Sequence, residues 1–194
     1  MTHFSIKEYL VSEYLRTGAA SNFHLTKELS HSLITQTCLA YLSQFDKIDT
    51  LDWQTIESSP LAEYAARYWI SHGRSGGIDK SDNCAMLTLS LNLFTCDGAS
   101  FTNWLRIFDL DFPWRRINLE RNQTDIAPPL YYAALAGLER VSKVLLERVA
   151  DVNGHGGRYG NALQVASYRG NEGIVKLLLE NDVDVNAQGG QCRN

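Results

Sequence analysis

Two pairs of side chains in this 194-residue sequence have types and spacings that metal sites use. His24 and His31 are seven residues apart and share one face if their segment is helical, but two histidines do not complete a tetrahedral zinc site. Asp109 and Asp111 lack the further oxygen ligands and the glycine of a calcium loop, so we expect them to form a turn or to end a helix. We therefore predict no bound metal.

The serine, glycine and cysteine residues do not indicate a catalytic or cofactor-binding site. Ser75 stands among glycines in a segment that we expect to be a loop, and loops hold nucleophiles poorly. The glycines between 154 and 160 recur at 189 and 190, which favours turns between repeats over a phosphate cradle. We interpret the widely separated cysteines as reduced thiols: Cys38, Cys84, Cys96 and Cys192. We expect no enzyme and no cofactor; a hydrolase whose triad assembles from distant residues is the alternative.

The composition excludes several classes of function. The chain has 18 basic and 22 acidic residues, and its net charge of −4 creates no positive field for nucleic acid or anionic lipid. The most apolar stretch, 85–94, is about half as long as a bilayer span requires. The sequence does not open with a charged leader and an apolar run, so we expect a cytoplasmic protein. The expected partners are proteins, and not nucleic acid, membranes or small-molecule substrates.

The C-terminal part of the sequence repeats itself. A shift of 33 positions superimposes 129–161 on 162–194, with 14 identical pairs among the 33. A fixed period of this length is typical of stacked repeats, in which neighbouring units complete each other's core. The register continues into Gly189 and Gly190, so we expect a third unit that is truncated. Two units are fewer than such arrays usually need, which predicts a frayed C-terminal helix pair.

Each unit has the pattern of two short helices and a turn. In the first unit, Leu130 belongs to the apolar face of a helix that ends at Gly137. Val141 begins the i, i+3, i+4 stripe of a second helix. The segment 151–157 that follows is rich in turn formers. The second unit repeats this pattern, with its first helix ending at Gly170.

These units resemble ankyrin repeats. The resemblance rests on Pro-Leu-Tyr-Tyr-Ala-Ala at 129–134, Gly-Asn-Glu-Gly-Ile-Val-Lys-Leu-Leu-Leu at 170–179 and Asp-Val-Asn-Ala at 184–187. The Thr-Pro-Leu-His signature departs in both units, with Pro128 and Asn161 in place of its threonine and Tyr131 and Gln164 in place of its histidine. The resemblance implies stacked helix pairs whose turns and inner helices bind proteins. Asn161 is a candidate helix cap.

The residues before the repeats are predicted to be helical. The N-terminal capping signals are Ser5 with Glu8, Thr26, and Ser59 with Pro60. The last signal opens a helix with a stripe of Leu61, Tyr64, Ala65, Tyr68 and Trp69, closed by Gly73. The segment 87–93 alternates like a strand, but because no partner strand is evident we expect a helix, as we do for 100–108. We expect the tryptophans to lie in the core or between helices: Trp53, Trp69, Trp104 and Trp114.

These N-terminal segments resemble the helical region that joins a NACHT nucleotide-binding module to ankyrin repeats in fungal NOD-like receptors of the STAND class. The resemblance spans residues 3 to 125 and rests on 3–10, 38–42, 60–69 and 104–111. The chain has no Gly-x-x-x-x-Gly-Lys-Ser/Thr loop, so the ATPase of those receptors does not carry over to it.

The predicted fold is all-α, with a helical bundle at 1–125 followed by a short ankyrin-repeat solenoid at 126–194, in units of about 129–161 and 162–194. The functional hypothesis is non-catalytic protein binding by the concave ankyrin face, in fungal signalling or non-self recognition. The alternative is a truncated linker or sensor part of an ATP-dependent STAND switch. The candidate partner-binding residues, for which ordinary solvated surface is the other interpretation, are Leu135, Ala136, His155, Arg158, Tyr168 and Arg169.

Overall fold

The computed structural model describes residues 8–9, 12–18, 25–47, 51–80, 84–94, 99–148 and 150–190, and within these residues it has ten α-helices and no strand. The prediction of an all-α fold is therefore confirmed. The helices are α2 (Glu13–Thr17), α3 (Lys27–Leu42), α4 (Trp53–Glu57), α5 (Ala62–Ser75), α6 (Cys84–Leu93), α7 (Ala99–Ile107), α8 (Pro129–Ala136), α9 (Glu139–Glu147), α10 (Ala162–Arg169) and α11 (Glu172–Leu179). Ser5 of the predicted capping box, His24 of the histidine pair, Cys96 and Cys192 lie outside the described residues.

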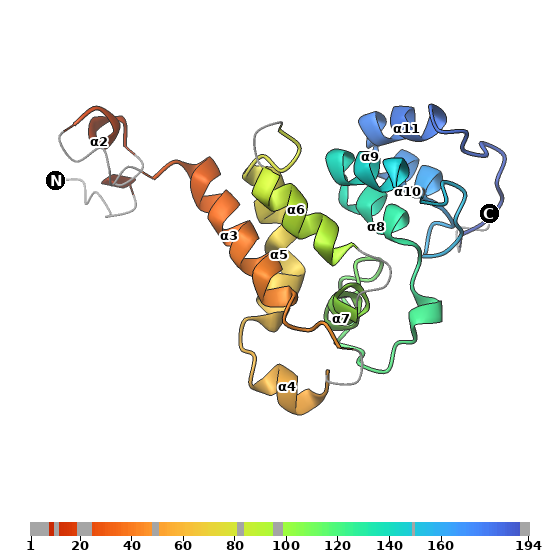
Figure 1. Ribbon diagram of the computed structural model, residues 1–194, viewed down its shortest axis with the longest axis horizontal. Coiled ribbons are helices and arrows are strands. Elements are labelled where there is room, and N and C mark those ends of the chain that lie inside the picture. The colour runs from red at the N-terminus through yellow and green to blue at the C-terminus, as the bar shows by residue number, and fades with distance from the viewer. Residues whose placement is uncertain are drawn as a thin grey trace.

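Helix α3 begins where its capping residue predicts. The hydroxyl of Thr26 accepts a hydrogen bond from Leu29 N at 3.0 Å, which satisfies one of the free N–H groups at the start of the helix. Figure 1 shows α3, α5 and α6 side by side, and α3 packs against both of the others. The backbones approach closely at Gly76, where a Cβ would lie 2.7 Å from Ser32 N.

Helix α5 differs from its prediction at both ends and in its buried face. It begins at Ala62 without a side-chain cap, because Ser59 and Pro60 form a turn before it, and it continues through Gly73 to Ser75. The three largest residues of the predicted stripe outside Trp69 are exposed by 43 to 51%: Leu61, Tyr64 and Tyr68. Ala65 and Trp69 of the stripe are buried, and the other buried residues of α5 are Ala62, Ala66, Ile70 and Gly73. Four of these six residues are small, which lets neighbouring helices approach closely.

The two shorter helices that follow confirm their predictions. The alternating segment 87–93 belongs to α6, and the predicted helix at 100–108 is α7. Ser90 is buried in α6, but its hydroxyl donates to Met86 O at 2.8 Å. A polar residue inside the alternating pattern is thus satisfied within the helix and needs no partner strand.

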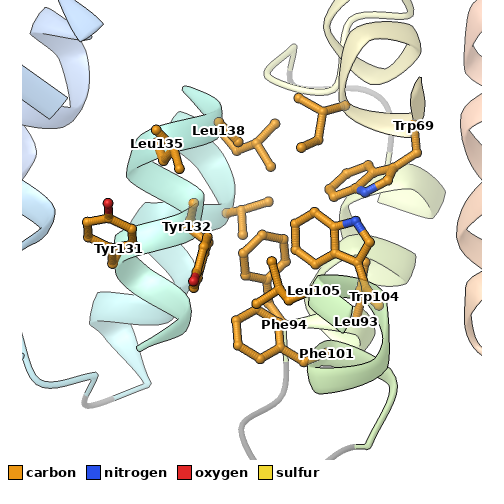
Figure 2. Packing of buried hydrophobic residues seen from close by; sticks show 14 of the residues in the cluster. Trp69, Leu93, Phe94, Phe101, Trp104, Leu105, Tyr131, Tyr132, Leu135 and Leu138 are labelled. Atoms are coloured by element: carbon orange, nitrogen blue, oxygen red, sulfur yellow. The ribbon is translucent and has the colours of Figure 1, made fainter. Parts of the chain in front are cut away.

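An aromatic core joins these helices to the first helix of the repeats (Figure 2). The ring centroids of Trp69 and Trp104 are 5.5 Å apart, and Trp104 Nε1 donates to Ala66 O at 2.9 Å. Phe101 of α7 meets Tyr132 of α8 edge to face at 5.8 Å. These contacts bury the face of α8 that would otherwise be open to solvent, so the bundle covers the start of the array as a capping unit does.

The repeats consist of two helix pairs, α8 with α9 and α10 with α11 (Figure 1). As predicted, the first helices end at Gly137 and Gly170, both in the left-handed region with φ of 69°. Asn171 Nδ2 donates to Ala134 O at 2.8 Å, which connects the second pair to the first. Asn161 caps α10 as predicted, since its Oδ1 accepts from Gln164 N at 2.8 Å.

The bundle and the repeats share one hydrophobic core, which extends from Cys38 to Val183. The predicted boundary at residue 125 falls in the irregular segment 108–128 between α7 and α8, which includes one short 3₁₀ helix, Gln123–Asp125. The division into two domains stays a prediction.

The interface of α3 and α5 also contains a histidine pair. His31 Nδ1 lies 2.7 Å from His72 Nδ1, and His72 Nε2 lies 2.9 Å from the Tyr64 hydroxyl. Burial and the neighbouring His31 lower the pKa of His72. One ring must accept the hydrogen bond between the two histidines, so this arrangement is lost when both are protonated.

The pair predicts an acid-sensitive interface. The pKa of His72 is lower in the folded than in the unfolded state. As the pH falls below the ordinary pKa of histidine, the unfolded state therefore binds more protons than the folded state, and the free energy of unfolding declines. We expect the urea midpoint of the wild type to fall between pH 7.5 and pH 5.5, and to fall less in His72→Asn. Equal declines in both proteins would contradict this role.

Candidate functional site

A network of hydrogen bonds, which we call the knot, connects the segment before α8 to the first repeat and its turn. Its members are Asp111, Tyr131, Arg158 and Tyr159. Asp111 is only 4% exposed, and its carboxylate accepts from the Tyr131 hydroxyl at 2.5 Å and from Arg158 N at 3.2 Å. The Tyr131 hydroxyl in turn accepts from Tyr159 N at 3.2 Å. Burial raises the pKa of Asp111, and burial together with the Asp111 carboxylate raises the pKa of Tyr131. Gly157, with φ of 71°, leaves room for the Tyr131 ring, with which any side chain would collide.

The predicted turn at Asp109 and Asp111 is present, but the prediction missed what else these residues do. Asp109 Oδ1 accepts from Asp111 N at 3.1 Å, which is the expected turn. Asp109 also pairs with Arg121 at 3.3 Å, and both side chains are 12% exposed. Neither carboxylate is an ordinary solvated turn residue.

Beside this knot lies an aromatic and arginine surface that we call the aromatic–arginine strip. The guanidinium of Arg115 stacks 3.8 Å from the centre of the Phe112 ring, and that of Arg158 lies 5.4 Å from it. Arg158 also lies 5.5 Å from the Trp114 ring. The strip continues through the rings of Tyr159 and Tyr168, which are tilted by 32° and have centroids 4.4 Å apart. The members of the strip are Phe112, Trp114, Arg115, Arg158, Tyr159 and Tyr168.

The expected burial of the tryptophans is right for two of the four. Trp69 and Trp104 are fully buried. Trp53 is 57% exposed and Trp114 is 70% exposed, because Trp53 lies in the short α4, which has no buried residue, and Trp114 stands on the strip. Exposed tryptophan next to arginine is the composition that protein interfaces favour.

Behind the strip is a cavity of about 340 Å³ that we call the arginine cleft. Its charged lining consists of five arginines and three aspartates: Arg106, Arg115, Arg116, Arg121, Arg158, Asp109, Asp111 and Asp125. The charge of the lining is therefore positive, although the whole chain is acidic.

A second cavity, of about 480 Å³, lies between α5, the residues after α7 and the C-terminal ends of α8 and α10. We call it the concave hollow. Its lining is apolar at Ile70, Phe108, Leu110, Leu135 and Ala136, with Ser71 and Ser75 beside them, and its charged residues are Arg67, Arg74 and Arg169. Arg67 also pairs with Glu63 at 3.1 Å.

The six predicted partner-binding residues fall into separate groups. Leu135, Ala136 and Arg169 line the concave hollow, although the two apolar side chains are only 5% and 6% exposed and form its floor. Arg158 and Tyr168 belong to the strip, where Tyr159 lies between them. His155 is exposed in the turn and lines neither cavity. The part of each residue in binding stays a prediction.

The other sequence candidates are scattered. Within the described residues no group of three or more His, Cys, Asp or Glu side chains is placed to hold a metal. Cys38 is buried, which raises the pKa of its thiol, and Cys84 is exposed; both are free. Ser75 is not in a loop but is the last residue of α5. The segment 73–77 therefore ends a helix and does not form the strand-to-helix turn of a nucleophile elbow. None of the described helices is both long and apolar enough to span a bilayer.

The repeats match a known family. A family model for ankyrin repeats, in three copies, matches residues 108–189. The match begins well before α8 and so includes the segment that forms the knot and the strip. The C-terminal part of this chain therefore consists of ankyrin repeats.

One relative extends the similarity beyond the repeats. The chain is 36% identical over 184 residues to "Azaphilone pigments biosynthesis cluster protein L" of Monascus ruber. The aligned region covers 86% of this chain and 37% of that relative. The chain is thus homologous to a fungal cluster protein and spans little more than a third of its length. Neither match supports a relation to NACHT-containing receptors, and no solved structure matches the chain.

Proposed function

We propose that this chain is a non-catalytic protein-binding module whose concave ankyrin face takes an acidic segment of a partner protein. The observation that carries this proposal is the concave hollow, which has an apolar floor and three arginines but no acidic residue in its lining. The partner segment places one apolar side chain on the floor of the hollow, and acidic residues on both sides of that side chain bind the arginines.

The apolar floor supplies the first part of the interaction. Ile70, Phe108 and Leu110 lie with Leu135 in a hollow open to solvent. An apolar side chain placed on this floor is removed from water, which stabilises the complex by about 25 cal/mol for each Å² buried. The hollow is small beside a whole protein interface, so the segment extends along the neighbouring turns of the repeats.

The arginines supply direction and selectivity. Arg74 and Arg169 come from α5 and α10, on two sides of the hollow. Within the described residues neither has an ion pair, so both guanidinium groups are available to carboxylates of the partner. Arginine binds carboxylate in a bidentate geometry, and charge complementarity across an interface favours acidic partners over basic ones.

A peptide-display selection against the whole chain tests the proposal. The library holds random peptides of mixed composition, and we expect the selected peptides to have acidic residues on both sides of one apolar residue. We expect the double variant Arg74→Glu, Arg169→Glu to bind the selected peptides at least tenfold more weakly, because two positive charges at the hollow are replaced by two negative ones.

The matched control changes the same charge elsewhere. Lys143 and Arg148 are exposed on α9 and at its end, and line neither cavity. The variant Lys143→Glu, Arg148→Glu is expected to bind within twofold of the wild type. Selection of peptides without acidic residues, or equal losses in the two double variants, would overturn the proposal.

We propose fungal signalling or non-self recognition as the setting of this binding. The alternative is that the chain is the linker or sensor part of an ATP-dependent STAND switch, and the observation that favours it is the much greater length of the relative. A Gly-x-x-x-x-Gly-Lys-Ser/Thr loop encoded directly upstream in the genome would decide for the switch. An upstream sequence without such a loop would decide against it.

A further inference from the structure

The arginine cleft has more positive charge than its own fold uses. Arg121 is engaged by the fold, since it donates to Tyr132 Oη at 3.1 Å and pairs with Asp109. Arg106 is engaged as well, since its Nε donates to Arg121 O at 2.9 Å. Arg116 and Arg158 have no ion pair among the described residues, and Arg115 lies 3.9 Å from Asp109, at the outer limit of a pair.

The aspartates of the cleft are already satisfied. Both carboxylate oxygens of Asp111 accept hydrogen bonds, and Asp109 accepts from Asp111 N and pairs with Arg121. Asp125 is exposed at the rim. Five arginines against three aspartates leave two positive charges in surplus, which matches the charge of a phosphoryl dianion.

Two of the available arginines are held in place before any ligand arrives. Arg115 stacks on the Phe112 ring, and Arg158 lies over the rings of Phe112 and Trp114 while its backbone N–H is bound by Asp111. Stacked guanidinium groups lose less conformational freedom on binding than free ones. Their planar donors fit the oxygens of a phosphoryl group in bidentate fashion.

From this geometry we propose that the arginine cleft binds a phosphoryl dianion through Arg115, Arg116 and Arg158, at a site separate from the concave hollow. The same chemistry is presented by a small phosphate compound and by a phosphorylated side chain of a partner protein. Either ligand reaches the cleft from solvent at the exposed Arg116, and the exposed Trp114 ring lies 5.5 Å from the Arg158 guanidinium.

The test uses the full chain with two probes. Inorganic phosphate is added at constant ionic strength, with sodium chloride as the reference, while the amide NMR signals of Gly157 and Arg158 are followed. A neutral glycine–serine peptide with one phosphoserine is then compared by calorimetry with the same peptide without phosphate. We expect phosphate to shift both amide signals and the phosphopeptide to bind at least tenfold more tightly than its unphosphorylated form.

Variants assign the site. The double variant Arg116→Ala, Arg158→Ala is expected to bind phosphate and phosphopeptide at least tenfold more weakly than the wild type. The control variant Lys143→Ala, Arg148→Ala is expected to bind both within twofold of the wild type. We expect the urea midpoint to be unchanged in both double variants. The hollow variant Arg74→Glu, Arg169→Glu also stays within twofold, which separates this site from the proposed protein-binding face.

The two probes distinguish the source of the dianion. A phosphopeptide that binds more tightly than inorganic phosphate supports a phosphorylated partner, and equal binding supports a small phosphate compound. Amide signals that respond to phosphate as they do to chloride, together with equal binding of the two peptides, would overturn the proposal. Equal losses in the cleft variant and the Lys143, Arg148 control would overturn it as well.

Discussion

Replacing Trp104 with alanine is expected to lower the free energy of unfolding by about 3–5 kcal/mol. The side chain is fully buried and packs against both Trp69 and Phe94, with ring centroids 5.5 and 5.6 Å away. Its removal leaves a cavity at the centre of the bundle and deprives Ala66 O of the indole hydrogen bond. Urea unfolding followed by far-ultraviolet circular dichroism measures the loss.

The same chain offers a control with the same residue type. Trp114 is 70% exposed, so Trp114→Ala is expected to change the free energy of unfolding by less than about 0.5 kcal/mol. The comparison separates burial from residue identity. Similar losses in Trp104→Ala and Trp114→Ala would contradict the placement of these two side chains.

Removal of a single hydroxyl from the knot is expected to have the second largest effect. In Tyr131→Phe the buried carboxylate of Asp111 loses one of its two hydrogen-bond donors and Tyr159 N loses its acceptor. Hydrogen bonds to charged groups contribute about 1.5–3 kcal/mol, so we expect a loss of about 2–3 kcal/mol in urea unfolding. Tyr168→Phe, on a side chain 65% exposed, is the matched control and is expected to change little.

The pH dependence of this loss identifies its cause. Burial raises the pKa of Asp111, and the Tyr131 hydrogen bond opposes that rise. Tyr131→Phe therefore raises the pKa of Asp111 further, and the folded variant takes up a proton at a higher pH than the wild type does. Proton uptake by the folded state stabilises it as the pH falls, so the deficit of Tyr131→Phe should be smaller at pH 5 than at pH 7. A deficit that grows on acidification would contradict a role for the Asp111 carboxylate.

The parts of the fold that follow from local pattern were predictable from sequence. The period of 33 residues places α8 to α11, because the first helix of each pair ends at its own glycine, Gly137 or Gly170. Thr26 and Asn161 were identifiable as caps, since the bonds that they make are to residues three positions later. Local capping depends little on what packs around the helix.

The face of α5 was not predictable by the same means. A search for large apolar residues at helical spacing selects Tyr64 and Tyr68, which are exposed. The contact with α3 has small residues at Ala65 and Gly73, and a Cβ at Gly73 would lie 3.4 Å from the Thr35 side chain of α3. Only the position of α3 shows which side of α5 is buried.

The candidate sites depend on contacts that are distant in sequence. The carboxylate of Asp111 accepts from Arg158 N, 47 positions away, and the strip combines residues before α8 with the turn after α9 and with Tyr168 of α10. Arg158 and Tyr168 were predicted as partner-binding residues from their type and their place in the repeat, and their part in binding stays a prediction. Trp114 gave a misleading signal, since tryptophan favours burial, as at Trp69 and Trp104, but the Trp114 side chain is 70% exposed. The clustering of arginines around Phe112 becomes visible only once the segment is folded against the first repeat.

The central claim is that a protein partner lies on the concave face, and photo-crosslinking tests it most directly. A photoreactive amino acid placed at Ser71 stands at the hollow without removing either arginine, and one placed at Leu179, 50% exposed on α11, serves as the reference. With the acidic peptide selected by display, we predict a crosslink from position 71 and none from position 179. A crosslink from position 179 in the absence of one from position 71 would contradict the claim.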